Sequence, residues 1–142
     1  MKITFGIIIA FSLLMGCKTA SKVTAGNDLD GQWVLAVFPY QKKTLAEVFG
    51  NRVVQLQFDK SSNRIFGTTG CNRFTGDYTV STDSLRFSQN LALTKMACPG
   101  FDEQLVLQAF NRVNRYRLIE SQLELMQNNE IVMIFARKLE TN

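Results

Sequence analysis

The sequence predicts an α+β fold: a curved antiparallel sheet or open β-barrel with one main helix packed against it. Three observations lead to this fold class. Apolar and polar residues alternate over most of the chain after residue 31, turn-forming residues interrupt the alternation, and one later segment changes to helical spacing. Strands on both sides of a single helix are typical of one α+β domain. After the leader described below, the 142 residues leave room for one domain and not for two.

Period-two alternation marks the expected strands. They cover residues 32–38, 53–58, 78–80, 85–87, 91–93, 116–119, 123–126 and 131–136. Polar turns separate several of them, at residues 60–63, 81–83, 121–122 and 128–129. Such short turns favour antiparallel hairpins. A helical turn is expected at residues 44–48, where Thr44 and Glu47 have the spacing of a capping box.

Residues 102–113 follow a helical period instead. Their apolar side chains fall on one stripe, formed by Leu105, Val106, Ala109, Phe110 and Val113. Asp102 is expected to cap this helix, while Glu103 near its start and Arg112 near its end suit the helix dipole. The stripe predicts that the helix packs on the sheet.

Residues 1–16 predict a bacterial signal peptide. Lys2 precedes an apolar stretch, residues 3–15, that only Thr4 and Ser12 interrupt. The stretch is shorter than the roughly 20 apolar residues of a membrane-spanning helix. We therefore expect it to be removed after export, the alternative being a buried N-terminal helix or strand.

The leader ends in Leu14-Met15-Gly16-Cys17, which resembles the lipobox of bacterial lipoproteins. Cys17 is therefore the predicted lipid attachment residue, and residues 17–28 are expected to form a flexible tether of small and polar residues. Lys18 stands where an aspartate would favour retention in the inner membrane. The expected location is the cell envelope, as an outer-membrane lipoprotein facing the periplasm.

Of the three cysteines, Cys71 and Cys98 remain once Cys17 is assigned to lipid. Oxidising compartments favour pairing of such residues, so a Cys71–Cys98 disulfide is expected. Closing a loop of about 28 residues would stabilise the fold by roughly 3.5 kcal/mol. Two free, buried thiols are the alternative, and a catalytic role for Cys71 would need a base to lower its pKa.

Composition argues against several function classes. The net charge is only +4, with no basic run beyond Lys42-Lys43, so no nucleic-acid partner is expected. The chain has no histidine, which removes the Ser-His and Cys-His nucleophile pairs and histidine metal sites. We expect neither enzymatic activity nor a cofactor.

Three other groups of residues are candidate sites. Single carboxylates are expected on the solvated surface, although two facing one cleft could serve a glycosidase; they include Asp59, Asp77, Asp83 and Glu103. The glycine-rich residues 67–76 lack the ending of a phosphate loop, so their glycines predict bulges or close backbone approaches. Met96, Met126 and Met133 could be soft metal ligands but are expected in the core.

Two cysteine motifs carry a resemblance to a known family. They are Gly70-Cys71-Asn72-Arg73-Phe74, followed by Gly76 and Tyr78, and Thr94-Lys95-Met96-Ala97-Cys98. With the strand patterns around them, they make most of residues 29–137 resemble the META domain family, which includes HslJ-like heat-shock proteins. Thr75 and the pair Asn128-Asn129 depart mildly from the family pattern. On this basis residues 29–142 are expected to form the META domain.

The resemblance implies a small β-rich fold with a helix, frequent lipoprotein attachment and an association with envelope stress. It implies no catalytic residue. The leading hypothesis is a non-enzymatic envelope lipoprotein that binds or stabilises a partner through its sheet or a helix–sheet groove. The alternatives are an apolar-ligand or lipid carrier, for which Phe58, Phe87 or Phe110 would line a cavity, a secretin-pilot-like chaperone, and a carboxylate-dependent hydrolase. The expected partners are the membrane, through the lipid, and an envelope protein or apolar ligand.

Overall fold

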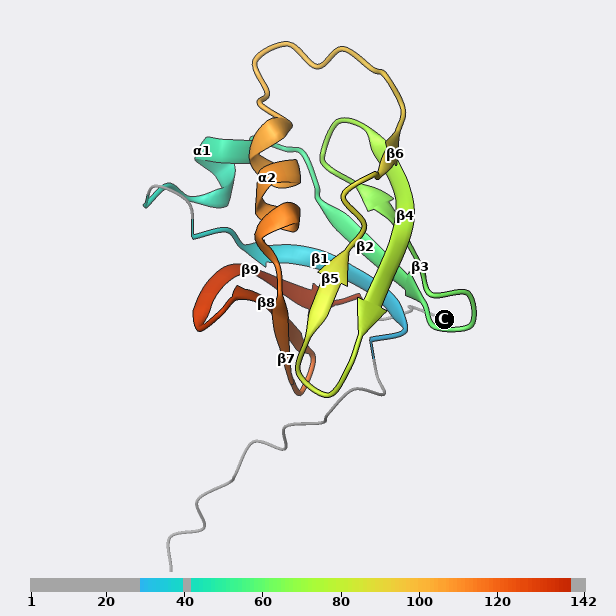
Figure 1. Cartoon of the computed structure of the whole chain (residues 1–142). Coiled ribbons are helices and arrows are strands. Elements are labelled where there is room, and N and C mark those ends of the chain that lie inside the picture. The colour runs from blue at the N-terminus through green and yellow to red at the C-terminus, as the bar shows by residue number, and fades with distance from the viewer. Residues whose placement is uncertain (1–28, 40–41, 139–142) are drawn as a thin grey trace, which may run out of the picture.

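The computed structural model describes residues 29–39 and 42–138, which form an antiparallel sheet curved into a nearly closed barrel (Figure 1). Its strands are β1 (Gly31–Val37), β2 (Gln55–Asp59), β3 (Arg64–Thr68), β4 (Arg73–Val80), β5 (Leu85–Phe87), β6 (Ala92–Leu93), β7 (Arg115–Ile119), β8 (Gln122–Gln127) and β9 (Glu130–Arg137). The helices are α1 (Leu45–Phe49) and α2 (Gln104–Arg112). The leader, Cys17 and the tether lie outside the described residues.

The strands follow the order β5-β4-β3-β2-β1-β9-β8-β7, and β6 pairs with β4 on the edge that β5 also uses. The two ends of this order meet near the β4–β5 turn. There Tyr116 N donates to Asp83 O at 3.1 Å, and Arg115 Nη2 lies 2.6 Å from Asp83 Oδ2. Helix α2 contacts both β5 and β9, so it covers the remaining gap. Of the two expected forms, the sheet is therefore a nearly closed barrel and not an open curved sheet.

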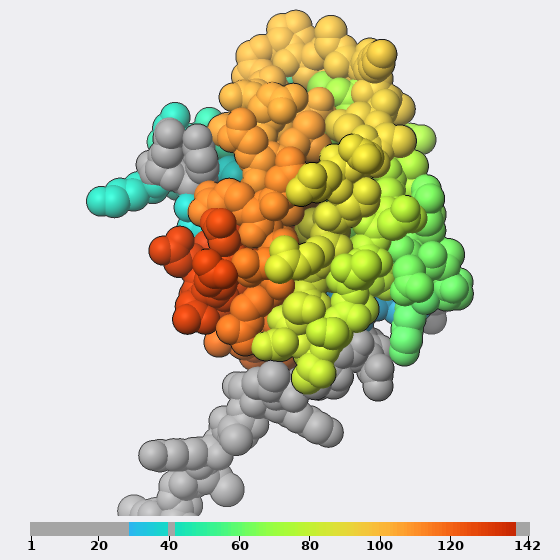
Figure 2. Space-filling view, in the orientation of Figure 1, coloured from blue at the N-terminus to red at the C-terminus, as the bar shows by residue number. Residues whose placement is uncertain are grey.

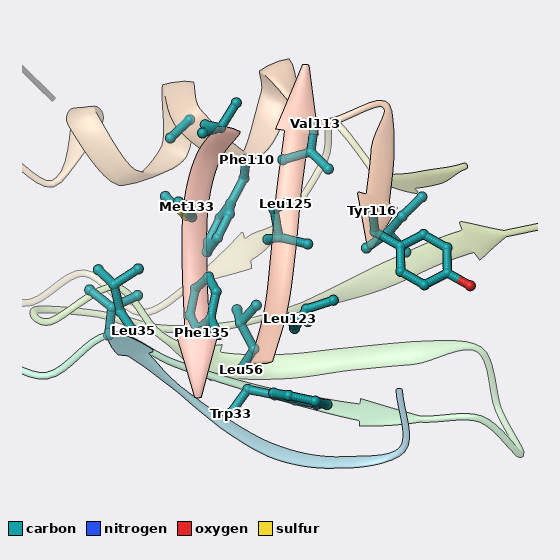
Figure 3. Packing of buried hydrophobic residues seen from close by; sticks show 14 of the residues in the cluster. Trp33, Leu35, Leu56, Phe110, Val113, Tyr116, Leu123, Leu125, Met133 and Phe135 are labelled. Atoms are coloured by element: carbon teal, nitrogen blue, oxygen red, sulfur yellow. The ribbon is translucent and has the colours of Figure 1, made fainter. Parts of the chain in front are cut away.

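The expected helical stripe is confirmed. Val106, Ala109, Phe110 and Val113 are buried, and Leu105 packs at the edge of the core. Figure 3 shows Phe110 reaching from α2 toward the strands that carry Leu125 and Met133. The largest fully buried side chains are Trp33, Phe58, Phe110 and Phe135. One aromatic-rich core therefore joins the helix to the barrel.

Local signals set the element ends where they lie. Thr44 and Glu47 form the expected capping box at the start of α1. The turn at residues 60–63 connects β2 to β3, with Asn63 at a positive φ of 52°. Asn tolerates this conformation better than most residues.

Strand β3 was not among the strands expected from alternation, and β4 begins earlier than expected. The cause is the run of glycine and threonine, which hides the apolar period. At Gly67 an added Cβ would lie 2.0 Å from the carbonyl oxygen of Gln55. At Gly76 it would lie 2.4 Å from the side chain of Leu91. The expected close approaches therefore occur, and they fall inside paired strands.

Candidate binding site

The disulfide joins the start of β4 to the approach of α2. Cys71 and Cys98 are bonded, their Cα atoms are 6.0 Å apart, and 27 positions of sequence separate them. Both residues are partly buried. The bond therefore ties residues 94–103, which connect β6 to α2, to the end of the sheet.

Asn72 holds the same segment through its side-chain amide, and it is only 4% exposed. Its Oδ1 accepts from Met96 N at 2.7 Å and from Thr94 Oγ1 at 2.8 Å. Its Nδ2 donates to Glu103 Oε2 at 2.9 Å and to Met96 O at 3.4 Å. Beyond the backbone hydrogen bond from Thr94 N to Arg73 O, this side chain therefore takes the place of strand pairing in the segment.

Glu103 is a partner of this network, so the expectation of a solvated surface carboxylate is wrong for this residue. Its Oε1 accepts from Asn72 N at 3.1 Å and from the Thr69 hydroxyl. Thr69 is fully buried. The helix begins without a side-chain cap from Glu103, and the expected cap, Asp102, accepts from Gln104 N at 3.1 Å. Glu103 therefore satisfies buried donors of Thr69 and Asn72, in the connection between β3 and β4.

A shallow apolar depression lies beside this network on the outer face of β3, β4 and β6. Its volume is about 450 Å³. It is lined by Phe66, Gly67, Arg73, Phe74, Thr75, Ala92, Leu93 and Thr94. Cross-strand pairing sets Phe66 beside Thr75 and Thr75 beside Ala92 in one row. Because Phe66 remains 39% exposed, the row leaves apolar surface open to solvent.

Charges are unevenly placed around the depression. On its far side Arg64 pairs with Asp77 at 3.2 Å and donates to Thr75 Oγ1 at 2.8 Å. Arg73 lines the depression and is exposed, and within the described part of the chain it forms no ion pair. The rim next to β6 is therefore positively charged and uncompensated.

A second hollow of about 150 Å³ lies between α2 and the sheet. It is lined by Phe38, Pro39, Leu105, Gln108, Ala109, Arg112, Glu130, Ile131 and Val132. This is the helix–sheet groove that the sequence suggested. It is smaller than the depression and falls below the usual size of a ligand pocket. Figure 2 looks onto the face where α2, in orange, meets β5 and the red C-terminal strands.

The residues expected to line an apolar cavity pack against other aromatic rings instead; they are Phe58, Phe87 and Phe110. The Phe87 ring lies 6.3 Å from that of Phe58 and 5.3 Å from that of Phe110, centroid to centroid. These are ordinary packing distances for aromatic rings. Of the methionines, Met133 is in the core as expected, but Met96 is 63% exposed. The core expectation is wrong for Met96, because it follows β6 in a segment held through its backbone.

The remaining carboxylates have local partners. Asp77 and Asp83 form ion pairs with arginines. Hydrogen bonds from Ser61 and then Ser62 lower the pKa of Asp59 to about 2. Within residues 29–39 and 42–138 no cluster of three or more His, Cys, Asp or Glu side chains could hold a metal ion. None of the helices described is both long and apolar enough to cross a bilayer.

The fold and these surfaces define a small antiparallel barrel domain with one covering helix and a disulfide-tied segment. The META domain model matches residues 27–140, so the chain belongs to the META domain family, and the predicted resemblance is confirmed. The motif residues now have structural roles, since Asn72 and Cys71 hold the segment that carries Met96 and Cys98.

Two solved structures are similar to the chain. A protein from Burkholderia xenovorans, determined by NMR, is 24% identical, with a TM-score of 0.58, covering 79% of this chain and 85% of its own. A DUF4847 family protein from Bacteroides vulgatus, a crystal structure, is 10% identical, with a TM-score of 0.55, covering 80% and 96%. At these identities the likeness shows the fold alone. No curated protein matches the chain.

Proposed function

We propose that this chain is a non-enzymatic binding module of the cell envelope, carried on the outer membrane by lipid on Cys17. It binds an envelope partner through the depression on β3, β4 and β6. The link to envelope stress that the family resemblance implies belongs to this proposal, with binding as its molecular task. The observation that carries the proposal is the open apolar surface at Phe66 beside an uncompensated positive rim.

The position of the depression supports binding more than packing. Apolar surface on a monomeric domain marks a contact site when polar residues rim it. Phe66 lies on a strand in the middle of the sheet, between β2 and β4, where side chains have fixed directions. A rigid strand surface holds a partner at lower entropic cost than a loop does.

Photocrosslinking in living cells tests this function. A photoreactive phenylalanine analogue at Ala92, which is exposed on the row with Phe66, should crosslink the tethered chain to the same envelope protein in independent cultures. The matched control places the analogue at Gln122, which is exposed on β8 across the barrel. Absence of any protein adduct from Ala92, or identical adducts from both positions, would contradict the proposal.

An apolar small molecule is the second candidate occupant. The volume of about 450 Å³ favours it, because ligand pockets commonly fall between about 300 and 1,000 Å³. Native mass spectrometry of the chain extracted from membranes would show a bound species of constant mass. Replacing Phe66 with aspartate should then remove that species while leaving the fold intact.

No catalytic role is proposed for the carboxylates. Asp77, Asp83 and Glu103 are each bound to a local partner, and none of the three bonds joins two carboxylates. Panels of peptide, ester and glycoside substrates should give no turnover. A turnover that disappears in a folded Asp102→Asn variant would show that a carboxylate on the exposed approach to α2 is catalytic.

A further inference from the structure

Strand β6 has one unpaired edge. Ala92 pairs with Thr75, and Thr94 N donates to Arg73 O at 3.0 Å, so the hydrogen-bonding groups of residues 92 and 94 face β4. The N–H and C=O of Leu93 between them must point away from β4, because these groups alternate along a strand. Among the strands that the structure describes, none pairs with that side of β6. An unpaired edge can accept a strand from another chain.

The side chains beside this edge define two neighbouring positions. Leu93 packs against the core, so Ala92 and Thr94 lie on the outer face with the depression. One row runs from Ala92 on β6 through Thr75 on β4 to Phe66 on β3. The next row runs from Thr94, directly after β6, to Arg73 on β4. Ala92 is small, which leaves the apolar row accessible from the edge.

The second row is positively charged. Its charge comes from Arg73, which is exposed there and lines the depression. The nearest carboxylates described are already engaged, since Asp77 pairs with Arg64 and Glu103 binds Asn72 and Thr69. A partner therefore gains from an apolar group at the first row and a negative group at the second.

We propose that β6 binds an extended acidic peptide segment of a partner protein, which adds a strand to the sheet at the free edge of Leu93. An apolar side chain of the segment lies over Ala92 in the depression, and a carboxylate lies beside Arg73. Because side chains two residues apart share one face of a strand, the apolar and acidic residues of the segment are separated by one residue. This rests on the proposed function, for which it names the chemistry of the partner.

Fluorescence anisotropy with the full exported chain in phosphatidylcholine nanodiscs tests the proposal. The probe is a short fluorescein-labelled serine peptide with leucine and glutamate alternating at every second position. It should bind, and a peptide of equal composition with leucine and glutamate adjacent should bind about tenfold more weakly, because the two groups then face opposite sides. Backbone N-methylation of the probe should abolish binding, since it removes the ladder hydrogen bonds.

Arg73→Glu should weaken binding of the alternating peptide about tenfold. The matched control is Arg86→Glu, which makes the same charge change at an exposed position of β5, paired with Thr79. Residues 79 and 75 are roughly 13 Å apart along β4, beyond the screening length of about 8 Å in physiological salt, so this variant should bind as the parent does.

Equal binding of the alternating and adjacent peptides, retained binding after N-methylation, or equal losses in the two arginine variants would each overturn the proposal. These failures remain distinct from failure of the proposed function. If Ala92 crosslinks a protein in cells while the peptides do not bind, the module has a partner and the strand-addition mode is wrong. If Ala92 crosslinks no protein, the depression does not bind an envelope protein and the proposed function itself is wrong.

Discussion

Asn72 uses both ends of its side-chain amide, and that is why an asparagine stands at this position. Its carbonyl oxygen takes two donors from residues 94 and 96, and its amide nitrogen serves the Glu103 carboxylate. A leucine or aspartate of similar size could fill the space but not both roles. At the scale of single residues, this buried network depends on one side chain that both donates and accepts hydrogen bonds.

Replacing Asn72 with alanine should lower the free energy of unfolding by about 2 to 4 kcal/mol, because Met96 N and Glu103 lose partners in a nearly buried site. Urea unfolding followed by tryptophan fluorescence measures the loss through the single, buried Trp33. Asn90→Ala is the control, since Asn90 is exposed, and it should change stability by less than about 0.5 kcal/mol. Equal stability of the two variants would contradict a role for the network.

Asp59 should titrate with a pKa of about 2, because Ser61 and Ser62 donate to its carboxylate. Since the folded pKa is below the unfolded value of about 3.9, these bonds stabilise the fold above about pH 4 and stop doing so as pH falls toward 2. Carbon-detected NMR titration of the carboxyl group measures the pKa. In a Ser61→Ala, Ser62→Ala double variant the pKa should move back toward about 4; no movement would show that another cause lowers it.

At the scale of elements, residues 94–103 are the part of the domain that relies least on regular structure. They connect β6 to α2 without a helix or strand of their own. The Cys71–Cys98 bond and Asn72 hold them at neighbouring points on the end of β4. The same segment carries Thr94, which lines the depression, so its position helps to shape that surface.

A Cys71→Ser, Cys98→Ser double variant should lose about 2 to 4 kcal/mol of unfolding free energy, because its unfolded chain is no longer constrained. Chemical denaturation with and without a phosphine reductant measures this. The reductant should lower the stability of the parent chain to that of the variant and leave the variant unchanged. Two thiols that alkylate readily in denatured, non-reduced protein from the envelope would show that the bond does not form there.

At the scale of the whole molecule, the folded domain and the predicted lipid attachment residue occupy different parts of the chain. The four largest buried side chains of the described domain come from strands β1, β2 and β9 and from α2. A lipid on Cys17 would therefore fix location and not fold. Each buried methylene contributes about 0.8 kcal/mol to membrane binding, and firm attachment needs more than one acyl chain.

Cys17→Ala should abolish acylation and release the exported chain from membranes, while the midpoint of domain unfolding stays that of the parent. Membrane fractionation and intact-mass spectrometry give the two readouts. The Cys71, Cys98 double variant is the control, because it should keep the lipid. An exported parent chain with an unmodified Cys17 would refute the assignment.

The sequence by itself determined a helix at residues 102–113, which the structure shortens to Gln104–Arg112, and the capped turn at Thr44, most strands and the family. These depend on local periodicity and on motifs read in order. It could not supply strand β3, whose glycine and threonine conceal the period, nor the partners of Asn72 and Glu103, which lie 31 positions apart. The depression and the free edge of β6 likewise depend on which strands become neighbours. Strand pairing brings Phe66, Thr75 and Ala92 into one row. Long-range pairing is decided by the burial of the whole core, and no local pattern encodes it.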